Sequence, residues 1–360
     1  MKDSPHPAVE LRYGMSYRLP ALPTHCPLAL HQDYPATAPR VLAWLRPYLV
    51  DYFGESEQDS RITDRYLRQD LHRWGALCLP HTRPDRFFVQ QLWMNTAALV
   101  DDAFSAPWLR EPAARARLAG ELCTALGADD AGANPLVRLV RDVHRLMLPT
   151  GDSVGGRMVE AGRAVVVNNA TENTVEDLTD LDAYLGSSRR VNAYGFWILA
   201  VAEWSLGIDL GDIAAEDPLV RRACTLAIDH WILVNDLYSF AKELEEGETS
   251  NAVWVLLGQG APLQEALDAI AARAVATEQR FIATRDKIAT GPLRHRTDLS
   301  RFLVEVGHMI TGNLRHARES TRYHGDNRTL TDDLAGSPVP EPRTLTRLGT
   351  AHQPLTNPTR

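Results

Sequence analysis

Three polar side chains recur at four-residue spacing in the second half of the chain. Asn235, Ser239 and Glu243 lie in the segment Asn-Asp-Leu-Tyr-Ser-Phe-Ala-Lys-Glu. In an α-helix each step of four residues drifts by only about 40°, so the three side chains lie along one stripe. An amide oxygen, a hydroxyl and a carboxylate form a set of hard oxygen ligands. This set suits Mg²⁺, which leaves coordination positions open for water and phosphate.

The helix that carries this stripe is expected to be largely buried. A mostly apolar run from Ala227 to Val234 precedes the stripe, and no Gly or Pro interrupts it. We therefore predict one long helix from about Arg222 to about Gly247. A solvated helix face is the alternative interpretation, but buried polar groups need partners. Lys242, next to the last ligand, is in position to reach a phosphate that the metal brings in.

A pair of adjacent carboxylates forms a second candidate site. Asp101 and Asp102 end a run of apolar and small residues that begins at Leu92. Two carboxylates after an apolar helix are costly unless they are solvated or bound to a cation. A solvated helix end is the alternative, although acids oppose the helix dipole at a C-terminal end. The pair is therefore a candidate site for a cation.

The apolar residues that must position these groups recur at helical spacing, and no stretch shows the alternation of period two that is typical of strands. We predict roughly ten helices in an all-α, single-domain bundle over residues 36–325. The first helix begins near Thr37, and the others cover residues 62–74, 85–105, 112–126, 134–147, 152–172, 193–206, 222–247, 264–288 and 298–323. Residues 1–35 are a proline-rich strap. We expect residues 326–360 to form a disordered tail.

Composition excludes several classes of function. The 360 residues carry a net charge of −8, which makes nucleic acid an unexpected partner. An acidic protein still binds a diphosphate if divalent metal bridges the two. The four cysteines form no CxxC pair, so we expect reduced thiols and no zinc site. The N-terminus has no apolar signal core, and no stretch approaches the length of a membrane span. We expect a cytoplasmic protein.

The spacing Asn-Asp-x-x-Ser-x-x-Lys-Glu resembles the second metal-binding motif of bacterial class I terpene synthases, which ionise a linear prenyl diphosphate. The Asp pair resembles the start of their first motif, but Ser105 and Ala106 stand where that motif has its third acid. The resemblance covers roughly residues 20–325 and implies a helical bundle with the active site in a central cavity. It implies three Mg²⁺ ions and the ligands Asp101, Asn235, Ser239 and Glu243. Asp102 is then expected to accept hydrogen bonds from a basic residue when the site closes.

The resemblance also assigns the residues that contact the diphosphate. Arg190 lies 45 residues before the second motif, where the family has an arginine that senses the diphosphate. Ala193 and Tyr194 then become the linker and the effector, whose backbone carbonyl acts. Gly195 is an equally arguable choice for the effector. For Arg190, the alternative interpretation is a surface salt bridge. Arg322 and Tyr323 close the last helix as in the family and are expected, with Lys242, to bind the diphosphate.

Candidate cavity-wall residues follow from the same resemblance, although helix spacing does not separate wall from core: Trp93, Met94, Ala97, Phe104, Trp197, Met309 and His316. For the histidine, a satisfied core position is favoured over a cavity base. Small residues before the Asp pair, and a methionine where family members often have tryptophan, favour a C20 geranylgeranyl substrate over C15 farnesyl. The function implied is a Mg²⁺-dependent cyclase, a carbon–oxygen lyase that releases diphosphate and forms a terpene hydrocarbon or alcohol, acting as a monomer or homodimer.

Two alternatives remain open. A prenyl diphosphate synthase needs two Asp-rich motifs to hold two diphosphate substrates, and this chain has one. A non-catalytic helical binding protein on the same fold is the alternative from another class of function, because the third acid of the first motif is missing. Mg²⁺-dependent release of diphosphate would distinguish the enzyme from such a non-catalytic binding protein.

Overall fold

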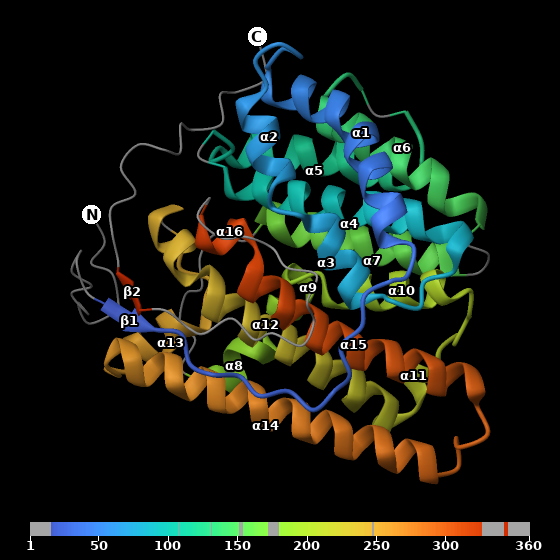
Figure 1. The fold of residues 1–360 in the computed structure, drawn as a ribbon, viewed down its shortest axis with the longest axis vertical. Coiled ribbons are helices and arrows are strands. Elements are labelled where there is room, and N and C mark those ends of the chain that lie inside the picture. The colour runs from blue at the N-terminus through green and yellow to red at the C-terminus, as the bar shows by residue number, and fades with distance from the viewer. Residues whose placement is uncertain are drawn as a thin grey trace.

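The computed structural model describes residues 16–106, 108–130, 132–150, 154–171, 180–246, 248–325 and 342–344. Over this part of the chain the fold is all-α, as predicted, with sixteen α-helices and one short antiparallel ribbon (Figure 1). In the ribbon, β1 (Ser16–Arg18) pairs with β2 (Pro342–Thr344), with Tyr17 opposite Arg343. Residues 1–15, 326–341 and 345–360 lie outside the described residues. The prediction of a disordered tail over residues 326–360 therefore falls on residues that are not described, except for the three residues of β2.

The first half of the chain forms one group of helices, whose members are α1 (Tyr34–Phe53), α2 (Arg61–Leu67), α3 (Leu71–Cys78), α4 (Pro84–Ser105), α5 (Pro112–Leu126), α6 (Pro135–Met147), the 3₁₀ turn η1 (Leu148–Thr150) and α7 (Val154–Thr171). Proline opens α4, α5 and α6. Proline is well placed at a first helical position because the amide hydrogen it lacks has no partner within the helix. These boundaries agree closely with those predicted from hydrophobic spacing.

The helix predicted over residues 62–74 is wrong, because the chain turns there and forms α2 and α3. Asp70 adopts a left-handed backbone conformation with φ of 55°. Its carboxylate accepts a hydrogen bond from the Tyr34 hydroxyl at 3.1 Å and lies 2.8 Å from His72 Nε2. Contacts with a distant helix hold this turn, so periodicity alone did not reveal it.

The second half adds α8 (Leu181–Gly186), α9 (Arg189–Asn192), α10 (Gly195–Leu206), α11 (Ile213–Glu216), α12 (Pro218–Glu246), α13 (Ala252–Gly258), α14 (Leu263–Thr290), α15 (Thr297–Glu319) and α16 (Thr321–His324). The 29-residue α12 packs against both α14 and α15, and α15 also packs against α3 (Figure 1). The predicted long helix thus begins four residues earlier than expected. Its expected end, Gly247, lies outside the described residues. The short helices α8, α9, α11 and α13 were not predicted, since they are too short to show a period. The helix predicted over residues 298–323 is broken at Ser320, where α15 ends and α16 begins.

A glycine sets how closely α15 approaches α3. A Cβ at Gly312 would lie 2.4 Å from the carbonyl oxygen of Leu77 and 2.7 Å from the amide nitrogen of Cys78. Real side chains do not tolerate such distances to backbone atoms, so only glycine fits here. This close contact brings the C-terminal end of α15, and α16 beyond it, to the same end of the bundle as the Asp pair.

The N-terminal strap is fixed along α14 and α15 rather than loose. The buried Glu278 carboxylate accepts the amide hydrogens of His25 and Cys26, both at 2.8 Å. Thr311 donates its hydroxyl to the Pro27 carbonyl at 2.6 Å. All four cysteines are free thiols. Within the described part of the chain, no helix combines the length and the apolar character that a membrane crossing requires.

Candidate active site

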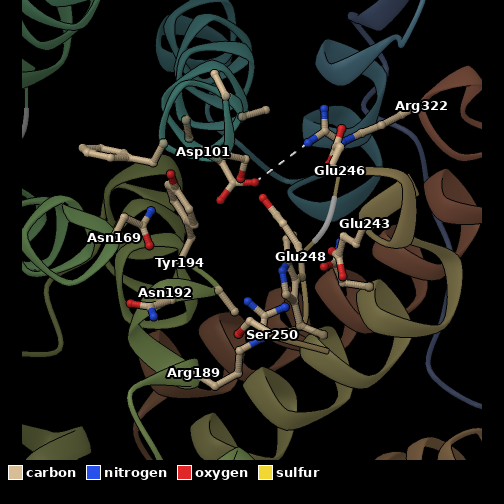
Figure 2. A pocket seen from close by; sticks show the side chains of 18 of the residues that line it. Asp101, Asn169, Arg189, Asn192, Tyr194, Glu243, Glu246, Glu248, Ser250 and Arg322 are labelled. Carbon is tan, nitrogen blue, oxygen red and sulfur yellow. Dashed lines mark ion pairs between the residues drawn. The ribbon is translucent and has the colours of Figure 1, made fainter. Parts of the chain in front are cut away.

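A cavity of about 530 Å³ lies between α4, the α9–α10 turn, α12 and α16. One part of its wall is apolar and rich in aromatic rings, and the residues there are Trp74, Trp93, Met94, Ala97, Ala98, Phe104, Ile198 and Trp231. The rest is polar and carries most of the candidate metal ligands (Figure 2). A mostly apolar pocket with convergent polar groups is the usual form of a small-molecule site.

Asp101 points into this cavity from the end of α4 (Figure 2). Its side chain is 46% exposed to the cavity space. It is nevertheless surrounded by protein at longer range, and burial together with the neighbouring charge of Asp102 raises the pKa of Asp101 to about 6. A carboxylate held in this way gains from a nearby cation, because a cation offsets both effects.

Asp102 does not line the cavity but is held by Arg322 from α16. The guanidinium donates to both carboxylate oxygens, from Nη1 to Oδ2 at 2.8 Å and from Nη2 to Oδ1 at 2.6 Å. The same Nη2 is 3.8 Å from Asp101 Oδ2. Lys242 Nζ lies 3.8 Å from Asp102 Oδ1 and 2.7 Å from Glu246 Oε2. Lys242 itself is not among the lining residues.

The stripe on α12 presents its ligands on the opposite side of the cavity. Asn235 and Glu243 line it, and the Asn235 amide donates to the Tyr323 hydroxyl at 3.0 Å. Ser239 lies between them on the helix but is not among the lining residues; it is 2% exposed, and its hydroxyl has no hydrogen-bond partner. A buried hydroxyl without a partner costs about 1–3 kcal/mol. A metal ion that accepts a lone pair from the Ser239 hydroxyl oxygen would remove this cost.

Glu243 is the acidic end of the stripe. Burial and the charge of Asp236 raise its pKa to about 7, and the Asn251 amide donates to Glu243 Oε2 at 2.8 Å. Over the described residues, no three His, Cys, Asp or Glu side chains cluster as a metal site. The stripe contains only one such side chain, and its other two donors are an amide and a hydroxyl. These oxygens, with an orphaned Ser239 hydroxyl among them, fit a Mg²⁺ ion that keeps part of its water.

The structure places Arg190 away from the cavity, in contrast to the expectation. Its guanidinium pairs with Asp229, at 2.7 and 3.2 Å, and it is not among the lining residues. Arg189 lines the cavity instead, and its Nη2 donates to Asp236 Oδ1 at 2.7 Å. Adjacent residues on a helical turn point about 100° apart, so only one of the two arginines can face the site.

The α9–α10 turn has an unusual backbone. Tyr194 has a φ of 63°, in the left-handed region that residues with a Cβ seldom adopt. A Cβ at the next residue, Gly195, would lie 2.5 Å from the Ile228 side chain, so that position must remain glycine for packing. The Tyr194 carbonyl accepts the first hydrogen bond of α10, from the Ile198 amide at 2.9 Å. No backbone amide of the described residues donates to the Ala193 carbonyl.

Three expected wall residues lie behind the cavity surface. Trp197 packs edge-on against Trp93, with ring centroids 5.2 Å apart. Met309 is buried, and its backbone carbonyl accepts a hydrogen bond from the Cys78 thiol of α3 at 3.8 Å. His316 stacks on Trp74 at 5.0 Å, and burial lowers its pKa to about 3, as befits a core histidine. The cavity's lining includes none of these three.

Several lining residues were missed by the sequence analysis. Glu246 and Glu248 follow the second motif and face the cavity near Asp101 (Figure 2). Asn192 lies three residues after Arg189, on the same face of α9, and both ends of its amide are buried without partners. Helical spacing from the correct arginine would have found it. Asn169 reaches the site from α7, and no sequence signal marks it.

The family model described as "Terpene synthase family 2, C-terminal metal binding" matches residues 92–280, which is more than half of the chain and includes both metal motifs. The chain belongs to the terpene synthase family. A "Microbial Terpene synthase-like protein 13" of Selaginella moellendorffii is 33% identical over 140 residues, only 39% of either chain. A "(3S,6E)-nerolidol synthase" of the same organism is 24% identical over 88% of this chain and 87% of its own length.

A curated bacterial synthase and two solved structures are also similar to this chain. The "Spiroviolene synthase" of Streptomyces violens is 27% identical over 66% of this chain and 68% of its own. Among solved structures, the SVS_A2 protein from ancestral sequence reconstruction has a TM-score of 0.71 at 26% identity, covering 82% of this terpene synthase and 90% of that chain. Germacradien-4-ol synthase from Streptomyces citricolor shares the fold, with a TM-score of 0.69 at 20% identity over 83% and 97% of the two chains.

Proposed function

We propose that this terpene synthase is a Mg²⁺-dependent class I cyclase that ionises a linear prenyl diphosphate and cyclises the resulting carbocation. The observation that carries the proposal is the division of one cavity into an aromatic, apolar wall and a polar end with Asp101, Arg322 and the α12 stripe. The apolar part suits a hydrocarbon chain, and the polar end suits a diphosphate with its metal ions.

Asp101, Asn235, Ser239 and Glu243 are the residues that would hold Mg²⁺, and the resemblance to class I enzymes implies three ions. Bound metal supplies positive charge that neutralises the charge developing on the departing diphosphate. The orphaned Ser239 hydroxyl and the raised pKa of Glu243 support this donor set, because a cation satisfies the first and favours ionisation of the second.

Basic and phenolic side chains of this chain bind the diphosphate. Arg322 offers a planar fork of donors that matches phosphate oxygens, and Tyr323 adds a hydroxyl. On the other side we infer that Arg189, rather than Arg190, contacts the diphosphate. The linker and effector then also fall one residue earlier than expected, on Asn192 and on the Ala193 carbonyl. Lys242 supports the site through Asp102 and Glu246.

The aromatic wall excludes water and stabilises the carbocation through ring faces. Trp74 and Trp231, stacked at 5.0 Å, present one such surface, and Trp93 lies on α4. Small side chains at Ala97 and Ala98 widen the cavity below the Asp pair. They favour a C20 geranylgeranyl substrate, with C15 farnesyl as the alternative.

The test is incubation of the purified protein with geranyl, farnesyl and geranylgeranyl diphosphates, with Mg²⁺ or with EDTA, followed by measurement of diphosphate and extracted terpenes. We expect a cyclic product from one substrate, lost with EDTA and in Asn235→Ala. Failure of all three to release diphosphate, from a protein with intact helicity, contradicts the proposal and favours a non-catalytic helical protein.

A further inference from the structure

One side of the cavity contains polar groups that neither the metal site nor the diphosphate site uses. Tyr194 lines the cavity, and its hydroxyl is buried without a hydrogen-bond partner. Asn169 is 7% exposed, and its amide nitrogen also has no partner. Figure 2 shows the Asn169 amide pointing toward the tyrosine, from a separate element of the fold.

The ring of Tyr194 and the backbone at Asn169 are both held in place. The Tyr194 ring stacks on Trp197, with centroids 5.6 Å apart and planes 18° from parallel. Its left-handed backbone directs the ring into the cavity. Arg115 fixes the other partner, since its guanidinium donates to the carbonyls of Asn169 and Ala170 and, at 2.7 Å, to that of Phe104.

Two neighbouring polar groups without hydrogen-bond partners in the cavity wall require an explanation. Each orphaned group costs about 1–3 kcal/mol, and an ordered water with two or more polar partners removes that cost. The hydroxyl and the amide are neighbours in the cavity wall (Figure 2). Burial raises the pKa of the Tyr194 phenol, and the nearby Asn169 amide lowers it in part, but the two groups are not in hydrogen-bonding geometry and do not satisfy each other. A neutral phenol and an amide are too weak as bases to take a proton from the substrate, so they suit a water molecule better.

We propose that Tyr194 and Asn169 hold the water molecule that terminates the reaction, so that the product is a terpene alcohol. The inference rests on the proposed cyclase function and names the class of its product. The oxygen lone pair of this water forms a C–O bond with the final carbocation. The oxonium ion then loses a proton to an oxygen of the released diphosphate. No oxidant or reductant is needed.

The proposal is tested by turnover in H₂¹⁸O, with products counted per diphosphate released. We expect one ¹⁸O atom in the main product. In Tyr194→Phe and in Asn169→Leu we expect the ratio of alcohol to hydrocarbon to fall on the order of tenfold, the value of one lost hydrogen bond to the water. Asn168→Leu is the matched control, since the Asn168 amide donates to Ala164 on its own helix, and its product ratio should equal that of the unchanged protein.

The outcomes separate this inference from the function on which it rests. Diphosphate released with only hydrocarbon formed, or an alcohol ratio unaffected by both variants, overturns the water site and leaves the cyclase intact. Absence of diphosphate release overturns both. Tyr194→Phe removes only a hydroxyl without a partner, so it should fold even if Asn169→Leu does not. A crystal structure provides a readout without turnover, because an ordered water bonded to both Tyr194 Oη and Asn169 Nδ2 is expected.

Discussion

Arg322 and Asp102 form a bidentate ion pair that joins α16 to the end of α4, although the two residues are 220 positions apart in the sequence. The arginine side chain is 8% exposed and the aspartate 18%. The pair holds the guanidinium 3.8 Å from Asp101, at the edge of the candidate metal site. It therefore fixes, in the absence of substrate, the guanidinium that we propose binds the diphosphate.

Arg322→Lys should lower kcat/KM by about 10- to 100-fold, because lysine keeps the charge but lacks the fork that contacts two oxygens at once. Steady-state kinetics with the preferred prenyl diphosphate measure the effect. Arg61→Lys, at an exposed arginine paired with Asp59, is the control and should leave the kinetics unchanged. Equal kinetics for Arg322→Lys and the unchanged enzyme would remove this residue from the diphosphate site.

The two adjacent arginines of α9 should respond differently to the same substitution. Arg189→Gln is expected to lower kcat on the order of 100-fold, since it removes a charge that faces the cavity. Arg190→Gln should change kcat by less than about threefold and act on stability instead, through its partner Asp229. Kinetics and thermal unfolding of both variants decide. The reverse order of effects would restore the assignment expected from the sequence.

Ser239→Ala should weaken Mg²⁺ binding about tenfold, which corresponds to one lost ligand contact. The metal-free variant should be at least as stable as the unchanged protein, because the buried hydroxyl has no partner to lose. The Mg²⁺-dependent rise in melting temperature measures both quantities. Ser205→Ala is a matched control, as that hydroxyl is also buried and unpartnered but lies on α10, outside the stripe of candidate ligands. Identical Mg²⁺ titrations of the two variants would exclude Ser239 as a ligand.

Acid should unfold the protein through its buried histidines. Burial lowers the pKa of His144 and His230 to about 4 and that of His316 to about 3. In the unfolded chain these histidines take up protons near pH 6.5, whereas in the folded protein they remain neutral down to their lowered pKa values. Their contribution to the free energy of unfolding is therefore complete above about pH 6.5 and is lost as the pH falls toward the folded-state pKa values. Together they contribute a slope of about 4 kcal/mol per pH unit near pH 5. Urea unfolding at several pH values measures the total slope, which His230→Leu should reduce by about 1 kcal/mol per pH unit.

Two glycines of α15 should differ in their tolerance of a methyl group. Gly312→Ala is expected to lower the free energy of unfolding by about 1–3 kcal/mol, because the added Cβ meets the Leu77 backbone. Gly307→Ala should instead raise it by about 0.5–1 kcal/mol, since its nearest contacts are at 3.6 Å or more and alanine favours the helix. Urea unfolding of both variants is the measurement. A neutral Gly312→Ala would mean that α3 and α15 can move apart freely.

The sequence alone determined the class of fold and the two metal motifs. Both depend on local spacing: the period of apolar residues predicts a helix, and Asn235, Ser239 and Glu243 share one face wherever that helix lies. The same reasoning failed at Asp70, where contacts from Tyr34 and His72 hold a turn inside a predicted helix.

Only the tertiary structure decided which groups meet across the cavity. Arg189 and Arg190 are equivalent in sequence, and the packing of α9 against α12 selects which of them faces the site. His316 and Trp197 have the residue types of a cavity wall but lie one layer behind it. Asn169 belongs to the site because Arg115 fixes the end of α7 there, a contact between residues more than fifty positions apart. Spacing along one helix is set by backbone geometry, whereas contacts between helices depend on the packing of the whole chain.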